Sequence, residues 1–160
     1  MRIIGGEHGG RKFNPPNKMP YTRPTTDIAK EGLFNVLQNN LDFEEIRTLD
    51  LFGGTGSISY ELASRGVEDL TIVEKDAAMY DFIKKTAATL RIENIQVIKM
   101  DVFKFINNCT EKFDFIFAGP PYALTTIDDL PKNIFEKQLL KTNGWFVLEH
   151  TPRNDYKKTA

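Results

Sequence analysis

The sequence has 160 residues, 41% of them hydrophobic and 27% charged, and a net charge of −1. This balance indicates a single soluble domain, and it excludes a protein that binds nucleic acid over its whole surface. The apolar runs are too short to cross a membrane, no secretory signal is visible, and the single cysteine, Cys109, excludes an internal disulfide and a cysteine-based metal cluster. No His, Asp or Glu spacing suggests a metal, and we expect a cytoplasmic protein.

The first 23 residues differ in charge from the rest of the chain. They carry five basic residues and one acidic residue, a local net charge of +4, and they are rich in Gly and Pro. We therefore divide the chain into a basic N-terminal arm (1–23), which forms an extended arm or a loop, and a domain (24–160). The arm could follow phosphates of a nucleic acid, or it could be a solvated tail.

The domain alternates helices and strands. After Pro24, apolar spacing predicts a helix with Leu33, Val36, Leu37 and Leu41 on one face. Strands are then predicted at 47–52, 70–76, 95–101, 113–118 and 144–150, with helices at 57–66, 79–90, 102–108 and 127–140 between them. Asp76 is placed to cap the helix at 79–90. Five alternations predict a doubly wound α/β fold, with a mostly parallel sheet covered on both faces.

A glycine-rich turn follows the first predicted strand. It reads Asp50-Leu51-Phe52-Gly53-Gly54-Thr55-Gly56. Small residues let the backbone approach a ligand closely and leave helix N–H groups pointing towards it. Ser59 stands where G-x-G-x-x-G requires its third glycine, which disfavours a dinucleotide, and the turn lacks the Lys-Ser/Thr pair of a P-loop.

Acidic residues end the next two strands. Glu74 could accept hydrogen bonds from both ribose hydroxyls of an adenosine, or it could pair with Lys75 or cap the next helix. Asp101 could accept from an adenine amino group and also cap the helix that begins at Val102. An adenosine cofactor with few phosphates, such as S-adenosylmethionine, fits these residues.

The fourth strand ends in Gly119-Pro120-Pro121-Tyr122. The two prolines fix the backbone and remove two N–H donors, which leaves carbonyl acceptors in a stiff turn. Tyr122 offers a ring on which a base can stack, and acceptors around an exocyclic amine favour its attack on a methyl group. A purely structural Pro-Pro turn is the alternative.

These pieces together resemble one family, the bacterial small-subunit (16S) ribosomal-RNA guanine-N2 methyltransferases. The matching segments are "MRIIGGEHGGRKF", "TRPTTDIAKEGLFNVL", "LDLFGGTGSISYELASRG", "VEKD", "MDVFKFI", "FDFIFAGPPY" and "GWFVLEH". The resemblance implies a class I methyltransferase fold, S-adenosylmethionine as cofactor, and a guanine of small-subunit ribosomal RNA as substrate, within an assembled or partly assembled subunit.

The resemblance also implies roles for particular residues. Gly119, Pro120, Pro121 and Tyr122 would hold the target guanine, flipped or splayed out of its RNA. Arg2, Arg11 and Lys12 would contact RNA. The cofactor would be lined by Arg23, Thr25, Asp50, Phe52, Gly53, Gly54, Gly56, Glu74, Lys75, Asp101 and Val102.

The chain departs from the family pattern at two places. Gly119 replaces an Asp or Asn expected to accept from the target amine, so we expect cofactor binding to be kept and catalysis to fall, unless water or Asp128 substitutes. Few residues follow the last predicted strand, so the C-terminal antiparallel hairpin of class I methyltransferases is expected to be missing. The strand at 145–148 would then be an exposed apolar edge that favours self-association.

Two other functions stay open at this point. An adenine-N6 methyltransferase of DNA or RNA uses the same Pro-Pro-aromatic turn. A non-catalytic assembly factor that binds RNA and cofactor is supported by Gly119.

Overall fold

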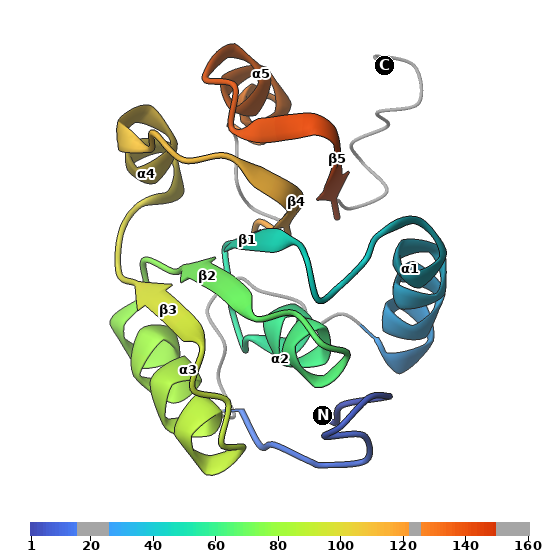
Figure 1. Cartoon of the computed structure of the whole chain (residues 1–160). Helices are drawn as coiled ribbons and strands as arrows, with labels where there is room; N and C mark the ends of the chain where they lie inside the picture. The colour runs from blue at the N-terminus through green and yellow to red at the C-terminus, as the bar shows by residue number, and fades with distance from the viewer. Residues whose placement is uncertain (16–25, 122–125, 150–160) are drawn as a thin grey trace.

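A computed structural model describes residues 1–15, 26–121 and 126–149. Its centre is a five-stranded sheet of order β3-β2-β1-β4-β5 in which all neighbouring strands are parallel (Figure 1). The strands are β1 (Arg47–Leu51), β2 (Asp69–Val73), β3 (Ile95–Ile98), β4 (Phe113–Ala118) and β5 (Leu140–Leu148). The predicted doubly wound class is confirmed, and the described sheet is wholly rather than mostly parallel.

Helices cover both faces of the sheet. They are α1 (Asp27–Asn40), α2 (Ser57–Ser64), α3 (Ala77–Thr89), α4 (Val102–Asn108) and α5 (Asp129–Glu136). One apolar cluster joins α4 and α5 to one face, while two others join α1, α2 and α3 to the opposite face (Figure 1). Successive residues of a strand point to opposite faces, so Leu49 and Leu51 pack towards α4 and α5 while Asp50 points towards α2.

The caps predicted for two helices are present. Asp76 accepts from the N–H of Met79 at 2.9 Å, and Asp101 accepts from the N–H of Lys104 at 3.1 Å. The predicted face of α1 is partly wrong. Its buried side chains are Lys30, Phe34 and Leu37, whereas Val36 is 49% exposed.

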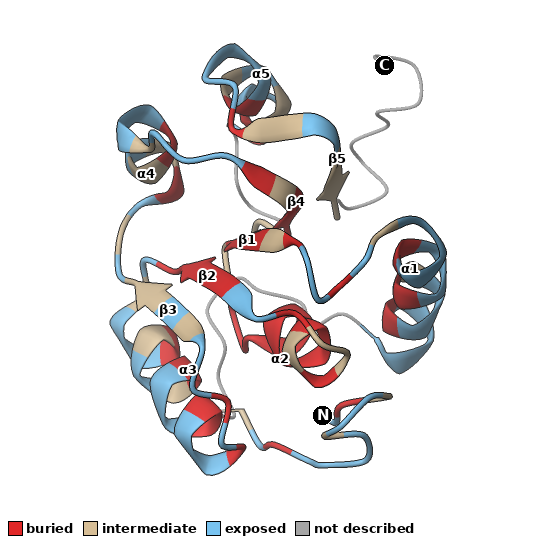
Figure 2. Ribbon diagram, in the orientation of Figure 1, coloured by how far each residue is buried: buried red, intermediate tan, exposed pale blue. Residues whose placement is uncertain are grey.

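The N-terminal residues form a hairpin loop packed against the domain, so the extended form of the predicted arm is wrong for residues 1–13. In this N-terminal hairpin (1–13), Arg2 bridges antiparallel to Lys12, and Ile3 and Phe13 are buried. The Phe13 ring meets Tyr60 of α2 edge-on, with centroids 5.1 Å apart. The hairpin lies beside α2 (Figure 1), and nearly all of α2 is buried (Figure 2). The predicted boundary between residues 23 and 24 falls outside the described residues.

The structure bears on two further expectations. In the part of the chain that it describes, no helix is both long enough and apolar enough to cross a membrane. β5 begins at Leu140, four residues before the predicted start at Gly144, because Leu140 pairs with Phe113 of β4 ahead of a register shift, after which pairing resumes with Trp145 opposite Phe115.

Candidate active site

The carboxyl ends of four strands meet at one edge of the sheet, linked by hydrogen bonds. The Gly119 N–H donates to the Leu51 carbonyl at 3.3 Å, which joins the turn after β4 to the end of β1. The Gly53 N–H donates to Val73, and the Glu74 N–H donates to Ile98, which extends the link to β2 and β3. β1 lies between β2 and β4, so the site is where the connections diverge, the usual ligand position in such sheets.

The backbone conformation and close packing of the glycine-rich turn require glycine at several positions. Gly54 and Gly56 have positive φ angles of 57° and 82°. A Cβ on Gly53 would overlap the Ile72 side chain, and one on Gly56 would overlap the Tyr60 hydroxyl. Phe52 is a bulky residue with φ of 59°, an uncommon conformation that marks a strained turn and that the sequence did not reveal.

Asp50 lies beneath this turn and is almost fully buried. It accepts from the Ser59 hydroxyl at 2.8 Å. Burial raises the pKa of Asp50 to about 7, the Ser59 bond opposes that shift, and the charge of Glu74 adds to it. Ser59, which breaks the dinucleotide pattern in the sequence, therefore anchors Asp50. Sequence reasoning missed this role.

Glu74 ties the glycine-rich turn to β2. One carboxylate oxygen accepts from the Gly54 N–H and the other from the Asp76 N–H, both at 2.8 Å. Each carboxylate oxygen has a second lone-pair direction, so a rigidly held Glu74 keeps capacity to accept from a ligand hydroxyl. The helix-capping alternative for Glu74 is wrong, because Asp76 caps α3, and a ribose contact remains compatible with this geometry.

The adenine end of the predicted site lies beyond β3. Asp101 is exposed and caps α4, as the alternative for that residue predicted, while Val102 is buried among the side chains beneath α4. Lys75 is exposed beside Glu74. Asp50 and Glu74 thus lie together under the turn, and Asp101 and Lys75 lie at the outer part of the same edge.

This donor set suits S-adenosylmethionine. The cofactor carries cationic groups, which the buried carboxylates of Asp50 and Glu74 complement, and a carboxylate. α2 begins at Ser57, and its N-cap residue Gly56 provides no side-chain cap, so the N–H groups and the dipole at this helix end favour an anion. Arg23 and Thr25, expected at the methionine end, lie outside the described residues.

The Gly-Pro-Pro turn is rigid and has space for a side chain. Gly119, Pro120 and Pro121 are half-buried. Gly119 does not have a positive φ, and a Cβ there would lie 3.2 Å from Phe117 Cε1, so a shift of a few tenths of an ångström would accommodate it. The fold therefore does not require glycine at this position. Tyr122 lies outside the described residues, and Asp128 is exposed at the start of α5.

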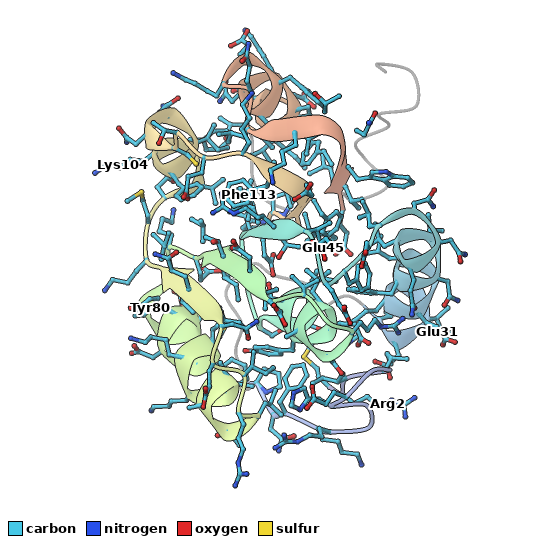
Figure 3. All side chains as sticks on the ribbon, viewed as in Figure 1. Arg2, Glu31, Glu45, Tyr80, Lys104 and Phe113 are labelled. Carbon is cyan, nitrogen blue, oxygen red and sulfur yellow. The ribbon has the colours of Figure 1, made fainter. Side chains whose placement is uncertain are left out.

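Two of the three residues expected to contact RNA are engaged within the protein. Arg2, which is labelled in Figure 3, forms an ion pair with Asp27 at 3.0 Å. Arg11 donates to the carbonyls of Leu90 and Thr89 at the C-terminal end of α3. Lys12 is exposed. These contacts hold the N-terminal hairpin against the domain and leave Lys12 facing solvent.

A second group that sequence reasoning missed connects the hairpin to α2. The ammonium of Lys30 donates to the Arg2 carbonyl at 2.6 Å and to the Ser57 hydroxyl at 3.0 Å, and it lies 3.6 Å from Glu61. Burial lowers the pKa of Lys30, and the charge of Glu61 opposes that shift. The one signal in the sequence is that Lys30 falls on the same helical stripe as Phe34 and Leu37.

The fold and this edge are those of a class I S-adenosylmethionine-dependent methyltransferase. Residues 1–160 match the family described as conserved hypothetical protein 95. The ribosomal RNA small subunit methyltransferase D of Escherichia coli K12 is 32% identical over 149 residues, which cover 93% of this chain and 71% of the relative. The chain belongs to the conserved hypothetical protein 95 family.

Solved structures agree on the fold. A hypothetical protein of Thermus thermophilus superposes with a TM-score of 0.86 at 27% identity, covering 97% of this chain and 88% of that one. The S-adenosylhomocysteine-bound methyltransferase PaMTH1 of Podospora anserina has a TM-score of 0.64 at 15% identity, covering 79% of this chain and 53% of that one. At that identity the second likeness shows the fold alone.

Proposed function

We propose that this chain transfers the methyl group of S-adenosylmethionine to the exocyclic N2 amine of a guanine in small-subunit ribosomal RNA. The observation that carries the proposal is the Gly119–Leu51 hydrogen bond, which sets the Gly-Pro-Pro turn against the start of the glycine-rich turn. A base held by one turn and a cofactor held by the other would meet at the switch point of the sheet. The name of the Escherichia coli relative supports ribosomal RNA as the substrate.

The cofactor supplies an electrophilic methyl group on a sulfonium. The guanine N2 would take this methyl group as the carbon–sulfur bond breaks, S-adenosylhomocysteine would leave, and the methylated amine would pass one proton to solvent. The amine lone pair is delocalised into the base, so acceptors placed at its hydrogens favour the reactive geometry. In this chain the backbone carbonyl of Pro120 is the candidate acceptor, because Gly119 supplies no side chain.

Other residues of the site would bind and orient. Glu74 would accept from the ribose of the cofactor, Asp50 would complement its positive charge, and Asp101 would accept from its adenine. Lys12, with Arg2 and Arg11, would contact RNA phosphates, and Tyr122 would stack on the target base. The assembled or partly assembled small subunit is the proposed form of the substrate.

Gly119→Asp tests the chemistry at the turn. The added carboxylate would accept from the target amine, and we expect methyl transfer to unmodified small ribosomal subunits to rise about 10²- to 10³-fold. Gly119→Ala is the matched control, because it adds the same Cβ beside Phe117 without an acceptor. The measurement is transfer of labelled methyl, with cofactor affinity determined for each protein by calorimetry.

The results separate the candidate functions. Equal transfer by the wild-type and Asp proteins would contradict the role of position 119. Transfer to adenine N6 rather than guanine N2, read by mass spectrometry of the nucleosides, would identify the adenine methyltransferase instead. The absence of transfer by every variant, with cofactor still bound, would favour the non-catalytic assembly factor, which Gly119 itself supports.

A further inference from the structure

We propose that a basic groove between α3 and the edge strand β3 binds the sugar–phosphate backbone of the RNA outside the target nucleotide. This inference rests on the proposed function, because it names a second contact with the same substrate. The groove has a volume of about 590 Å³, and its lining includes Lys84, Ala88, Arg91, Ile95 and Val97.

One wall of the groove is a single stripe of α3 and its C-terminal end. Lys84 and Ala88 are four residues apart on one face of α3, and Arg91 follows the C-cap of the helix with a left-handed φ of 60°. Tyr80 lies one turn before Lys84 on the same stripe. The opposite wall is the outer edge of β3, where Ile95 and Val97 are half-buried.

Two lysine side chains lie near an aromatic ring in the N-terminal half of α3. The Lys84 ammonium lies 5.3 Å from the centroid of the Tyr80 ring, and the Lys99 ammonium lies 5.8 Å from it. Figure 3 shows Tyr80 at the outer flank of the molecule by α3 and β3, on the side opposite Glu31 of α1. Basic side chains around a partly exposed ring are typical of surfaces that bind single-stranded RNA.

The charges of the groove are available to an anion. Elsewhere on the surface, basic side chains pair with acidic ones, as Arg47 does with Asp69 and Lys141 with Asp114. Among the described residues, no ion pair is formed by Lys84, Arg91 or Lys99. Glu93 also lines the groove, so its basic residues outnumber its acidic ones by two to one, on a chain whose net charge is −1.

The position of the groove also fits RNA. Lys99 follows the carboxyl end of β3, at the same sheet edge as the candidate active site. β3 is three strands from β4, which places Lys99 roughly 14 Å across the edge from the Gly-Pro-Pro turn. The groove continues to Arg91, beside the residues that the N-terminal hairpin contacts through Arg11. An RNA strand leaving the active site could follow this path over the sheet edge.

A matched pair of charge reversals tests this inference in the full-length protein. Lys84→Glu changes the groove, whereas Lys85→Glu makes the same change one residue away, on an exposed position that does not line it. We expect Lys84→Glu to weaken binding to unmodified small ribosomal subunits about 5- to 20-fold. The slope of the logarithm of the binding constant against the logarithm of salt concentration should fall by about one, which corresponds to the loss of one phosphate contact. Lys85→Glu should weaken binding less than about 2-fold, and both variants should bind cofactor as the wild type does.

A photocrosslinking side chain identifies the occupant. Benzoylphenylalanine placed at Ala88, an exposed groove residue, should crosslink to ribosomal RNA, while the same group at Lys85 should not. Crosslinking to a ribosomal protein instead would overturn the inference. Wild-type methyl transfer with equal affinities for the Lys84→Glu and Lys85→Glu proteins would overturn this inference alone. Wild-type protein that neither binds nor methylates subunits would overturn the proposed function and this inference together.

Discussion

Asp50 is the residue whose ionisation is most sensitive to its surroundings. An aspartate in an unfolded chain has a pKa of about 3.9, whereas Asp50 in the fold titrates at about 7. Between these values the folded protein holds a proton that the unfolded chain has released. The contribution of Asp50 to the free energy of unfolding is therefore largest below about pH 4 and falls as the pH rises to about 7.

Asp50→Asn should remove this dependence. The amide keeps an acceptor for the Ser59 hydroxyl and never has to be buried as an anion. We expect the stability of the variant relative to wild type to increase by about 2 kcal/mol between about pH 5 and pH 8, measured by urea unfolding of the cofactor-free proteins. Asp81→Asn, at an exposed position, is the control and should show no such trend. A difference between Asp50→Asn and wild type that stays constant with pH would refute the assignment.

At the scale of elements, Glu61 of α2 holds the N-terminal hairpin in place. Its carboxylate accepts from the N–H groups of Ile4 and Gly5 at 2.8 and 2.9 Å and from Arg65 at 2.8 Å, and it lies next to the Lys30 ammonium. Its side chain is fully buried. A buried carboxylate is tolerable only with such partners, so the hairpin and α2 depend on one another.

Glu61→Gln should loosen that connection. The amide leaves Lys30 without its buried counter-charge and turns an N–H group towards backbone donors, which should cost about 3–5 kcal/mol of unfolding free energy. Urea unfolding measures the loss, and faster hydrogen exchange at the Ile4 and Gly5 amides locates it. Glu68→Gln makes the same chemical change at an exposed position and should cost little. A loss no larger than that of this control would mean that the apolar contacts and the bonds of Arg2 and Arg11 hold the hairpin without Glu61.

The elements also show what sequence can predict. β4 was predicted at its observed bounds because five of its six residues are apolar and the Gly-Pro-Pro turn ends it. Asp76 and Asp101 were predicted as caps from local chemistry alone. β5 was predicted to start too late, since residues 141–143 are polar and the pairing shifts register between Phe113 and Phe115. Gly144 fits that irregularity, where a Cβ would lie 2.9 Å from the Lys141 carbonyl.

Contacts between segments far apart in the chain could not be predicted from local sequence patterns. The N-terminal segment was interpreted as an extended arm or a loop because its glycines and prolines are typical of loops. Its buried Ile3 and Phe13 gain their partners from α2, more than forty residues later in the chain. The four pieces of the candidate active site could be predicted together, because parallel strands bring their carboxyl ends to a single edge regardless of side-chain detail.

At the scale of the whole molecule, β5 lies at the edge of the described sheet and pairs only with β4 within it. Phe146 and Leu148 pack partly towards α4 and α5, while Trp145 and Val147 pack partly towards α1, so the strand is apolar on both faces and half-exposed. Unpaired backbone groups along such an edge can accept a strand from a second molecule.

We therefore expect this protein to self-associate through β5 as its concentration rises. Light scattering from about 10 µM to 1 mM should show a growing average mass, by analogy with other open strand edges. Val147→Lys should shift that growth to higher concentration, because a charge on an edge strand opposes pairing with another edge, whereas Ile28→Lys alters an 86%-exposed apolar residue on α1 and should leave it unchanged. A monodisperse monomer over the whole range would contradict the expectation. Association that Ile28→Lys and Val147→Lys suppress equally would assign it to general surface hydrophobicity rather than to the strand edge.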